Sequence, residues 1–274
     1  MYKLSKGSIS YSVSYPEYGQ QDLGVSAKGA SDMLSFEIAH ILLNRAESFQ
    51  CEEIIYANYI EIQRECMFCL TGAPYKDLLL NGVNPISQKK VYKAKKGERI
   101  VFKTKLKGFR SYFMCADIDT KRIGLEINNF THYFKPYLDK VRVIKGVEFD
   151  YLKNNAQFFQ NYFQISHNSN RMGIKLEGEK IEASSYDIIS SPVSDGTIQL
   201  TKDGPIVLMR HRQTTGGYPR VLQVISTDIN LLAQYKPTNL LMFELISLDE
   251  AKKILLEEKD ALKLIETKIN QLSR

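Results

Sequence analysis

The residues best suited to chemistry lie in one loop, at 210–220, with the sequence Arg-His-Arg-Gln-Thr-Thr-Gly-Gly-Tyr-Pro-Arg. The loop follows an apolar, strand-like run at 206–209. Gly216 and Gly217 carry no side chain, so a ligand can approach the backbone closely there. Four side chains of the loop can donate hydrogen bonds to an anion or a carbonyl oxygen: Arg212, Gln213, Thr214 and Thr215. A tight hairpin with a solvated tip would need only the glycines, so the polar set favours a binding or catalytic loop.

A shorter polar segment, Asn170-Arg171-Met172-Gly173, has the same character. No metal site is predicted. Cys66-Met-Phe-Cys69 has the spacing of a metal or redox pair, but it lies in an apolar strand-like run without a second pair or a nearby histidine. Buried structural cysteines are therefore expected. The sequence also contains no Walker-type loop and no dinucleotide fingerprint, so no motif for ATP or NAD is present in this chain.

The composition predicts a globular protein with one large or two medium domains. The chain has 274 residues, of which 43% are hydrophobic and 25% charged. No apolar run is long enough to span a membrane, so none is expected to do so. The first residues lack the apolar core of a signal peptide, and four cysteines without such a leader favour a reducing compartment. The cytoplasm is the expected location.

The net charge of +6 comes from one segment, residues 89–110, which has ten basic residues and a single acid, Glu98. Its lysines alternate with apolar residues, as they do on solvated sheet edges. Few aromatic side chains accompany them for stacking on bases, only Tyr92, Phe102 and Phe109. We therefore expect a solvated edge or a face for an acidic protein partner, and nucleic-acid binding is not expected.

The first half of the chain is predicted to consist mostly of strands. Residues 8–15 alternate between serine and apolar side chains, which predicts a half-buried strand. Its expected buried side is Ile9, Tyr11, Val13 and Tyr15. Asn81-Gly82 predicts a tight hairpin, because both residue types tolerate positive φ. One helix is expected to interrupt the strands, capped by Ser31 or Asp32 and ending at Asn44.

Strand patterns separated by turns continue through the second half, with a short helix expected within 149–159. This spacing favours barrels or sandwiches over alternating strand–helix units. The end differs, because Ser247-Leu-Asp-Glu250 is a capping box and a helix of about 25 residues follows. Packing against its own domain is the favoured role of its apolar stripe, and a partner or self-association surface is the alternative. The stripe is Leu248, Ala251, Leu255, Leu262, Ile265, Ile269 and Leu272.

Five segments occur here in the order of one known family. They are Gly29-Ala30-Ser31-Asp32, Leu70-Thr71-Gly72-Ala73, Asn170-Arg171-Met172-Gly173, Asp195-Gly196-Thr197-Ile198-Gln199 and Gln213-Thr-Thr-Gly-Gly-Tyr-Pro219. Through them the chain, from about Tyr11 to Ala251, resembles the allophanate-hydrolase-subunit-2-like family. That family includes the C subunit of 5-oxoprolinase, the KipA antagonist of a kinase inhibitor, and part of the biotin-dependent carboxyltransferase domain of urea amidolyase. The second-half motifs are specific as a set, and the first-half motifs are looser.

The resemblance implies a mainly β protein with two cyclophilin-like β-barrel domains, a few helices and a long C-terminal helix. The expected domains are a first barrel at 1–125, a second barrel at 126–246 and a C-terminal amphipathic helix at 247–274. It also implies a cytoplasmic bacterial protein that belongs to a hetero-oligomer. The implied partners are a subunit-B-like (KipI-like) protein and a subunit-A-like protein.

The implied activity is that of one subunit in an ATP-dependent 5-oxoprolinase-type hydrolase, which opens the cyclic amide 5-oxoproline to glutamate. ATP is used by the complex, and the sequence assigns no ATP site and no metal to this chain. One alternative is a non-catalytic regulatory binding protein of the KipA type. Another is the carboxyltransferase component of a biotin-dependent carboxylase.

The resemblance also suggests roles for particular residues. Arg212, Thr214 and Thr215 are the expected catalytic residues, because their donors suit a developing oxyanion or a phosphate. Arg171 is expected to clamp a substrate carboxylate. The expected substrate-binding set is Asp32, Asn170, Arg171, Gln199, Gln213, Gly216, Gly217 and Tyr218.

The chain departs from the family pattern at several points. The Arg-Gly-rich loop usual after Gln21-Asp22-Leu23-Gly24 is missing, and Ser31 replaces a methionine. His211 stands where an aspartate is frequent, and Asn170 replaces an aspartate. The loss of two carboxylates and a loop keeps altered specificity and a regulatory role open.

Overall fold

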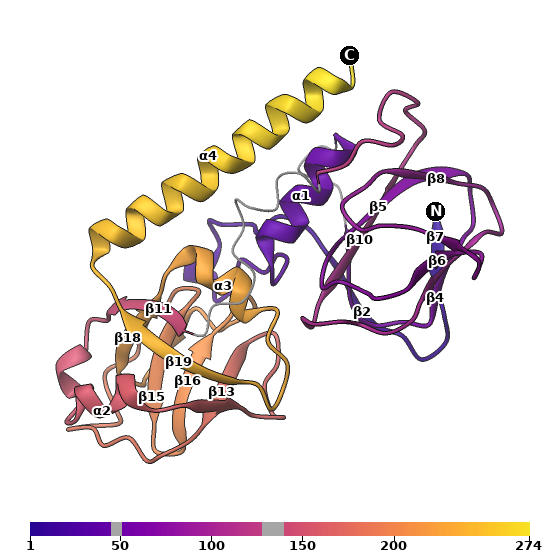
Figure 1. The fold of residues 1–274 in the computed structure, drawn as a ribbon. Coiled ribbons are helices and arrows are strands. Elements are labelled where there is room, and N and C mark those ends of the chain that lie inside the picture. The colour runs from indigo at the N-terminus through magenta and orange to yellow at the C-terminus, as the bar shows by residue number, and fades with distance from the viewer. Residues whose placement is uncertain (45–50, 128–139) are drawn as a thin grey trace. The chain divides into compact units, whose positions relative to one another are not determined.

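Two compact units make up the residues that the computed structural model describes, which are 1–44, 51–127 and 140–274. The first unit contains Met1–Tyr15, the chain from Asp32 to the undescribed stretch at 128–139, and Glu258–Arg274. The second contains Pro16–Ser31 and the chain from Lys140 to Glu257. Strands dominate both units, which confirms the mainly β class (Figure 1). The predicted domain boundary at 125 lies beside the undescribed stretch and stays a prediction.

The first unit has two five-stranded antiparallel sheets around one apolar core. One sheet has the order β1 (Tyr2–Leu4), β4 (Tyr59–Ile62), β9 (Arg99–Phe102), β6 (Leu78–Leu80) and β7 (Asn84–Pro85). The other has the order β2 (Ile9–Val13), β3 (Cys51–Tyr56), β10 (Ser111–Ala116), β5 (Cys66–Gly72) and β8 (Tyr92–Ala94). The predicted hairpin joins β6 to β7, with Asn81 and Gly82 at φ of 56° and 76°.

The second unit is a closed barrel of seven strands, sealed by the parallel pairing of its first and last strands. The order is β11 (Lys140–Lys145), β18 (Arg220–Val224), β15 (Thr197–Thr201), β16 (Gly204–Leu208), β13 (Gly173–Glu177), β12 (Phe163–Ile165) and β19 (Leu240–Leu245). Two short strands, β14 (Ser191–Pro192) and β17 (Thr215–Gly216), pair outside the barrel. Helices η1 (Gln21–Leu23), η3 (Phe149–Tyr151), α2 (Asn155–Gln160) and α3 (Ser226–Leu232) complete the unit. Helices η3 and α2, which precede β12, confirm the short helix expected within 149–159.

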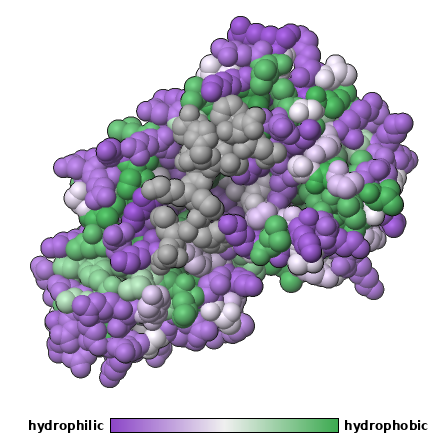
Figure 2. Space-filling view, in the orientation of Figure 1, coloured by the Kyte–Doolittle hydropathy of each residue, from purple (hydrophilic) through white to green (hydrophobic). Residues whose placement is uncertain are grey.

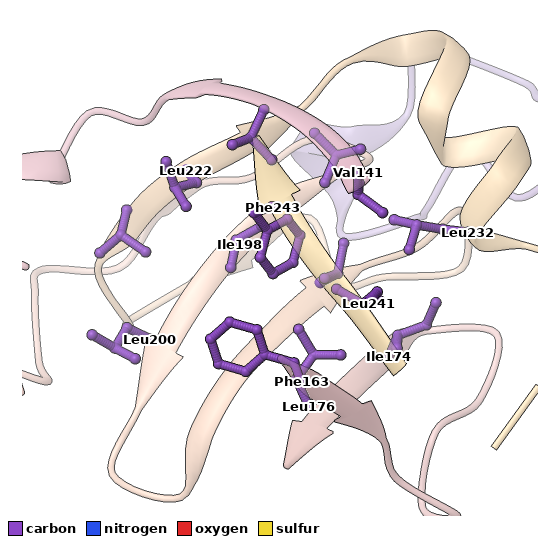
Figure 3. Packing of buried hydrophobic residues seen from close by; sticks show 14 of the residues in the cluster. Val141, Phe163, Ile174, Leu176, Ile198, Leu200, Leu222, Leu232, Leu241 and Phe243 are labelled. Carbon is purple, nitrogen blue, oxygen red and sulfur yellow. The ribbon is translucent and has the colours of Figure 1, made fainter. Parts of the chain in front are cut away.

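Aromatic and branched side chains fill the barrel interior (Figure 3). Phe158 lies with its ring centroid 5.0 Å from that of Phe163 and 5.5 Å from that of Phe243, and all three side chains are almost fully buried. Burial of such side chains is the main stabilising contribution to the unit, at roughly 1.5–3 kcal/mol each. A packed interior leaves the loops at the barrel's ends to carry function.

Both long helices begin where the sequence predicts. Helix α1 (Met33–Leu43) is capped by Asp32, whose side chain accepts a hydrogen bond from the Ser35 backbone N–H, and it ends at Asn44 in the left-handed conformation. Helix α4 (Leu248–Leu272) is capped by Ser247, whose Oγ accepts from the Glu250 N–H at 3.1 Å. Among the helices of the described residues, none has an apolar stretch that would span a bilayer.

Two predicted apolar faces are wrong in part. Ile9 and Tyr11 on β2 are 50% and 42% exposed, because β2 is an edge strand that pairs only with β3. On α4 the buried residues are Ala261, Ile265 and Ile269, whereas Leu248 and Leu272 are exposed. Hydrophilic residues cover most of the surface visible in Figure 2, and single exposed apolar residues of this kind are normal for a folded protein.

Four of the ten basic residues at 89–110 form ion pairs within the described part of the first unit. The pairs are Lys90–Glu126, Lys93–Glu65, Arg99–Glu61 and Arg110–Glu53. Lys105 instead donates to two backbone carbonyls. The high local charge in the sequence is therefore partly offset by acids that are distant in sequence and close in the fold.

Candidate functional site

The loop at 210–218 is held against a second segment of the barrel unit. Thr215 and Gly216 form β17, which pairs with β14, and the Val193 N–H donates to the Thr214 carbonyl at 3.1 Å. Gly216 lies close to a buried amide, and a Cβ there would lie 2.4 Å from Nε2 of Gln199, so a larger residue would have to displace that side chain. These contacts fix the backbone of the loop in place.

Four predicted binding residues come together around this contact. Gln199, on β15, is 2% exposed; its Nε2 donates to the Tyr218 carbonyl at 3.3 Å, and its Oε1 accepts from Gln213 Nε2 at 3.4 Å. Gly216, the fourth residue, lies against the same Gln199 side chain. A Cβ at Gly217 would meet only ordinary contacts at 3.5 Å, so that position is less constrained.

Arg212 and Arg210 share a single carboxylate, that of Asp195. Arg212 Nη1 lies 3.3 Å from Asp195 Oδ1, and Arg210 Nη1 lies 3.0 Å from Asp195 Oδ2. The two arginine side chains are 7% and 11% exposed. Arg210 also reaches Oδ1 of Asn230, on α3, at 3.4 Å. Asp195 precedes β15 and the arginines follow β16, so neighbouring antiparallel strands bring them to one end of the barrel.

Several donors of these arginines are buried without a hydrogen-bond partner among the described residues. They are Arg212 Nε, Arg212 Nη1 and Arg210 Nε. An arginine keeps its charge at every relevant pH, so two positive charges face one negative charge here. A buried donor without an acceptor costs about 1–3 kcal/mol, and more when it is charged. The arrangement is therefore suited to bind an anion, such as a carboxylate or a phosphate.

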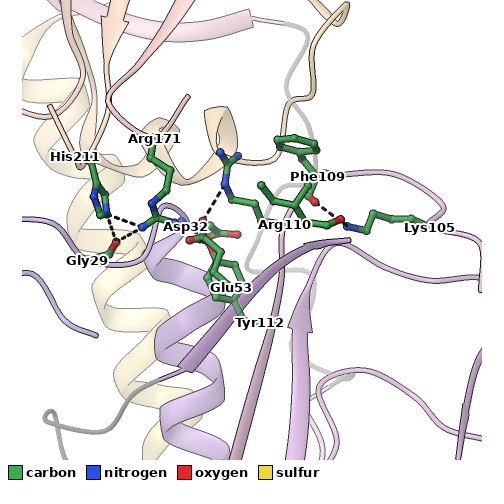
Figure 4. Close-up of polar contacts among 10 residues, drawn as sticks. Gly29, Asp32, Glu53, Lys105, Phe109, Arg110, Tyr112, Arg171 and His211 are labelled. Atoms are coloured by element: carbon green, nitrogen blue, oxygen red, sulfur yellow. Dashed lines mark hydrogen bonds and ion pairs between the residues drawn. The ribbon is translucent and has the colours of Figure 1, made fainter. Parts of the chain in front are cut away.

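Arg171 is engaged with a neighbouring backbone and with His211 (Figure 4). Its Nη2 donates to the Gly29 carbonyl at 2.9 Å and lies 2.6 Å from Nε2 of His211. Nε2 of His211 also lies 3.4 Å from the Gly29 carbonyl oxygen, so the arginine, the histidine and this carbonyl form one polar cluster. The backbone N–H of His211 donates to the backbone carbonyl of Arg171 at 3.1 Å, so the two residues are also joined through their main chains.

The remaining predicted site residues lie in other settings. Asn170 accepts at Oδ1 from the Met172 N–H at 2.8 Å, which closes a turn. Thr214 is half-buried and Thr215 is exposed. Asp32 belongs to the first unit, where it caps α1. Whether any of these residues contacts a substrate stays a prediction.

Sequence reasoning missed Asp195, Arg210 and His211 as site residues. Asp195 lies within one of the motif segments and Arg210 within the polar loop, so both were visible in the sequence. What identifies them is the pairing of one carboxylate with two arginines, which depends on the strand register.

A second buried charged network lies in the first unit (Figure 4). Arg110 Nε donates to Glu53 Oε1 at 3.1 Å, and the Tyr112 hydroxyl donates to Glu53 Oε2 at 2.9 Å. The same hydroxyl accepts from the Asp32 N–H at 2.8 Å, and burial raises the pKa of Tyr112. Lys105 Nζ donates to the carbonyls of Ile55 and Phe109 at 3.0 and 2.7 Å, and burial beside Arg110 lowers its pKa to about 8.

No metal site is found among the described residues, because no three histidine, cysteine, aspartate or glutamate side chains gather there. The chemistry available to the barrel loop is hydrogen bonding and charge.

The comparisons with known proteins identify the family. Residues 23–123 and 121–245 match the family described as carboxyltransferase domain, subdomain A and B, and the chain belongs to that family. Among named relatives, the C subunit of 5-oxoprolinase from Haemophilus influenzae is 27% identical, with 86% of this chain and 88% of that protein covered. The protein of the same name from Escherichia coli is 28% identical over the same shares of the two chains.

Two solved structures share the fold over 96% of this chain. They are the urea amidolyase of Kluyveromyces lactis, with a TM-score of 0.83 and 18% identity, and its urea carboxylase, with a TM-score of 0.84 and 17% identity. The chain spans 20% and 29% of the length of those two proteins. At this identity the likeness concerns the fold alone.

Proposed function

We propose that this chain is the C-type subunit of a 5-oxoprolinase-type assembly, which opens the ring of 5-oxoproline to glutamate at the expense of ATP. The two named relatives carry that subunit's name and match over 86% of the chain. A subunit of this type implies further subunits, and we expect a subunit-B-like partner and a subunit-A-like partner. A cytoplasmic location is part of the same proposal.

The observation that carries the proposal is the pair of buried arginines on one carboxylate. A ring-opening reaction develops negative charge on the lactam oxygen, and phosphoryl activation places a phosphate on the same oxygen. Nε of Arg212, which is buried without a hydrogen-bond partner among the described residues, suits either charge. The substrate also carries a carboxylate, and we expect Arg171 to bind it.

ATP enters this proposal as a substrate of the assembly. Its adenine and ribose are not assigned to residues of this chain, because the arginine pair supports binding of an anionic group only. The role of this chain's residues is to bind and orient an anion and to polarise a carbonyl.

A second candidate function follows from the family itself. A carboxyltransferase component would bind the carboxyl group of carboxybiotin, and the same arginine pair suits a carboxylate. This function requires a biotin carrier on another chain or domain.

The test is reconstitution with subunit-A-like and subunit-B-like proteins, followed by 5-oxoproline-dependent ATP hydrolysis. We expect turnover, and we expect Arg212→Ala to reduce it by a factor of about 100–1,000, the loss typical of one oxyanion donor. Lys202→Ala is the matched control, since it removes an exposed positive charge at the turn between β15 and β16. It should leave the rate unchanged.

Other outcomes separate the alternatives. A stable complex without turnover would contradict the hydrolase and favour a regulatory binding role of the KipA type. Transfer of carbon dioxide from carboxybiotin, with no 5-oxoproline-dependent hydrolysis, would establish the carboxyltransferase instead. Full activity of the Arg212→Ala complex would contradict the catalytic role of that residue.

A further inference from the structure

One side chain of β18, that of Gln223, organises the turn that carries Asp195. The turn is formed by residues 194–197 and leads from β14 into β15. Gln223 lies opposite Thr197 where β18 pairs with β15. It lies outside the polar loop at 210–220 and outside the five motif segments, so its importance comes from its position in the barrel.

Both ends of the Gln223 amide are hydrogen-bonded. Nε2 donates to the carbonyl oxygen of Asp195 at 2.6 Å and to that of Val224 at 3.1 Å. Oε1 accepts from the hydroxyls of Ser194 and Thr197, each at 3.0 Å. A backbone carbonyl can only accept, so the two carbonyls fix which end of the amide carries the nitrogen. One side chain therefore holds three of the four residues of the turn.

The turn is also built to receive this side chain. The Ser194 N–H donates to Thr197 Oγ1 at 3.1 Å, and the Thr197 N–H donates to the Ser194 carbonyl at 3.2 Å. Gly196 between them has a φ of 81°, and a Cβ there would lie 2.8 Å from Gln223 Nε2 and 2.9 Å from the Val224 carbonyl oxygen. Positive φ and this close approach both favour glycine, so the turn and the amide fit closely.

Asp195 connects this network to the arginine pair. Its carbonyl oxygen is held by Gln223. Its carboxylate lies 3.0 Å from Arg210 Nη1 and 3.3 Å from Arg212 Nη1. Only two side-chain torsions separate that carboxylate from the held backbone, so the position of the turn sets the position of the carboxylate. Gln223 therefore acts on the arginines through Asp195.

Strand β18 holds the same segment at a second point. Arg220, three residues before Gln223, donates from Nη1 to the Pro192 carbonyl at 3.0 Å, and its Nη2 pairs with Glu148 at 2.7 Å. Pro192 belongs to β14, which pairs with β17 of the polar loop. The chain from 192 to 197 is thus attached to β18 at both ends.

We propose that Gln223 is a positioning residue of the anion site: it fixes the 194–197 turn so that Asp195 orders Arg210 and Arg212 for binding an anion. The proposal rests on the anion-binding role that the proposed function gives to the two arginines. With Asp195 out of place, the two like charges would repel each other and the guanidinium groups would adopt several orientations, which must be given up on binding. The anion would then bind more weakly.

The test is titration calorimetry of the folded full chain with inorganic phosphate, at constant ionic strength. We expect Gln223→Leu to raise the dissociation constant about tenfold, the effect of one or two lost hydrogen bonds. Gln164→Leu is the matched control, because it makes the same change at an exposed position on β12 of the same barrel, and it should leave the dissociation constant unchanged.

A second pair of variants tests the same network without altering Gln223. Thr197→Val removes the hydroxyl that donates to Oε1 and should also raise the dissociation constant, whereas Thr197→Ser keeps the hydroxyl and should bind phosphate as the unaltered chain does. Equal weakening by both would assign the effect to packing and overturn the proposal.

The remaining outcomes separate this proposal from the proposed function. A merely structural role of Gln223 would lower the melting temperature of Gln223→Leu and leave its phosphate affinity unchanged, which would overturn the proposal. Failure of the unaltered chain to bind phosphate would overturn the proposal and the anion site together. Phosphate binding that depends on Gln223, in a chain whose reconstituted complex shows no 5-oxoproline turnover, would support the proposal and contradict only the hydrolase.

Discussion

Each of the two units holds a pair of neighbouring cations, and the two pairs differ in how the charge of the second cation is accommodated. In the first unit Arg110 pairs with Glu53, and the second cation is Lys105, which donates to two carbonyls and has its pKa lowered to about 8. In the barrel unit both cations are arginines, Arg210 and Arg212, on Asp195.

The difference lies in what each second cation can do. A lysine can lose its proton when burial penalises its charge, and carbonyl oxygens satisfy its donors. An arginine cannot lose its proton; Nε of Arg212 has no hydrogen-bond partner among the described residues, and its Nη1 makes only the 3.3 Å ion-pair contact with Asp195. The cluster of the first unit is therefore complete within the chain, and that of the barrel unit is completed by an anion from outside.

The largest expected effect is a difference in unfolding free energy between variants of the two clusters. Arg110→Met leaves Glu53, which is fully buried, without its counter-charge and should lower the free energy of unfolding by about 3–5 kcal/mol. Arg212→Met leaves Asp195 paired with Arg210 and replaces a buried charge by an apolar side chain of similar length, so the free energy of unfolding should change much less. Urea unfolding measures both, and hydrogen exchange shows which unit opens. Equal losses in the two variants would contradict the comparison.

The second prediction concerns ligand protection. Inorganic phosphate should stabilise the barrel unit, by about 2.7 kcal/mol when its concentration is 100 times its dissociation constant. Arg212→Met should abolish the protection and Lys202→Ala should keep it. Thermal unfolding against phosphate concentration, at constant ionic strength, is the measurement. Protection that survives in Arg212→Met would place the anion elsewhere.

Arg122 is another buried arginine of the first unit, and acceptors within the chain bind its guanidinium. It donates to the carbonyls of Ile41 and Leu42, at 2.9 and 3.1 Å, and to Asn270 Oδ1, at 2.7 Å. Arg122→Met should lower the stability of this unit by about 1–3 kcal/mol, because carbonyls at the end of α1 lose their donors. We expect faster amide exchange in residues 265–273. Unchanged exchange there would show that Arg122 does not hold the end of α4.

The smallest expected effect is a pH dependence from Lys105. Its pKa is about 8 in the folded state and about 10.4 in the unfolded chain, so the unfolded state binds more protons between those values. This group's contribution therefore makes stability rise with pH from about 8 to 10.4, and it is constant below that window. Lys105→Met should flatten this part of the stability curve, measured by urea unfolding at several pH values. A curve of the same slope in the variant would assign the titration to another group.

Local signals in the sequence predicted most elements correctly. Asp32 and Ser247 cap the two long helices as expected, because an N-cap needs only a side-chain oxygen three residues before a backbone N–H. Asn81-Gly82 forms the expected hairpin for a similar reason, since positive φ is a property of the residues themselves. The inward faces were less predictable. Ile9 and Tyr11 are exposed because strand order makes β2 an edge, and alternation alone does not reveal strand order.

The candidate site shows the same division. The 210–218 loop stands out by composition, and Gly216 lies there against the Gln199 side chain. The pairing of Asp195 with two arginines was not predictable, because it depends on the register of β15 against β16. The partial compensation of the 89–110 segment was equally hidden, since its acidic partners lie far away in sequence.

The sequence by itself determined the mainly β class, the helix ends, the tight turns and the loop that carries polar chemistry, all of which follow from residues within a few positions of one another. Only the tertiary structure decided which charges are compensated and which side chain holds the turn that carries Asp195. Coulomb interactions, hydrogen bonds and desolvation depend on distance in space and on burial, and the strand register sets both. The surplus positive charge that we assign to ligand binding is therefore a property of the fold.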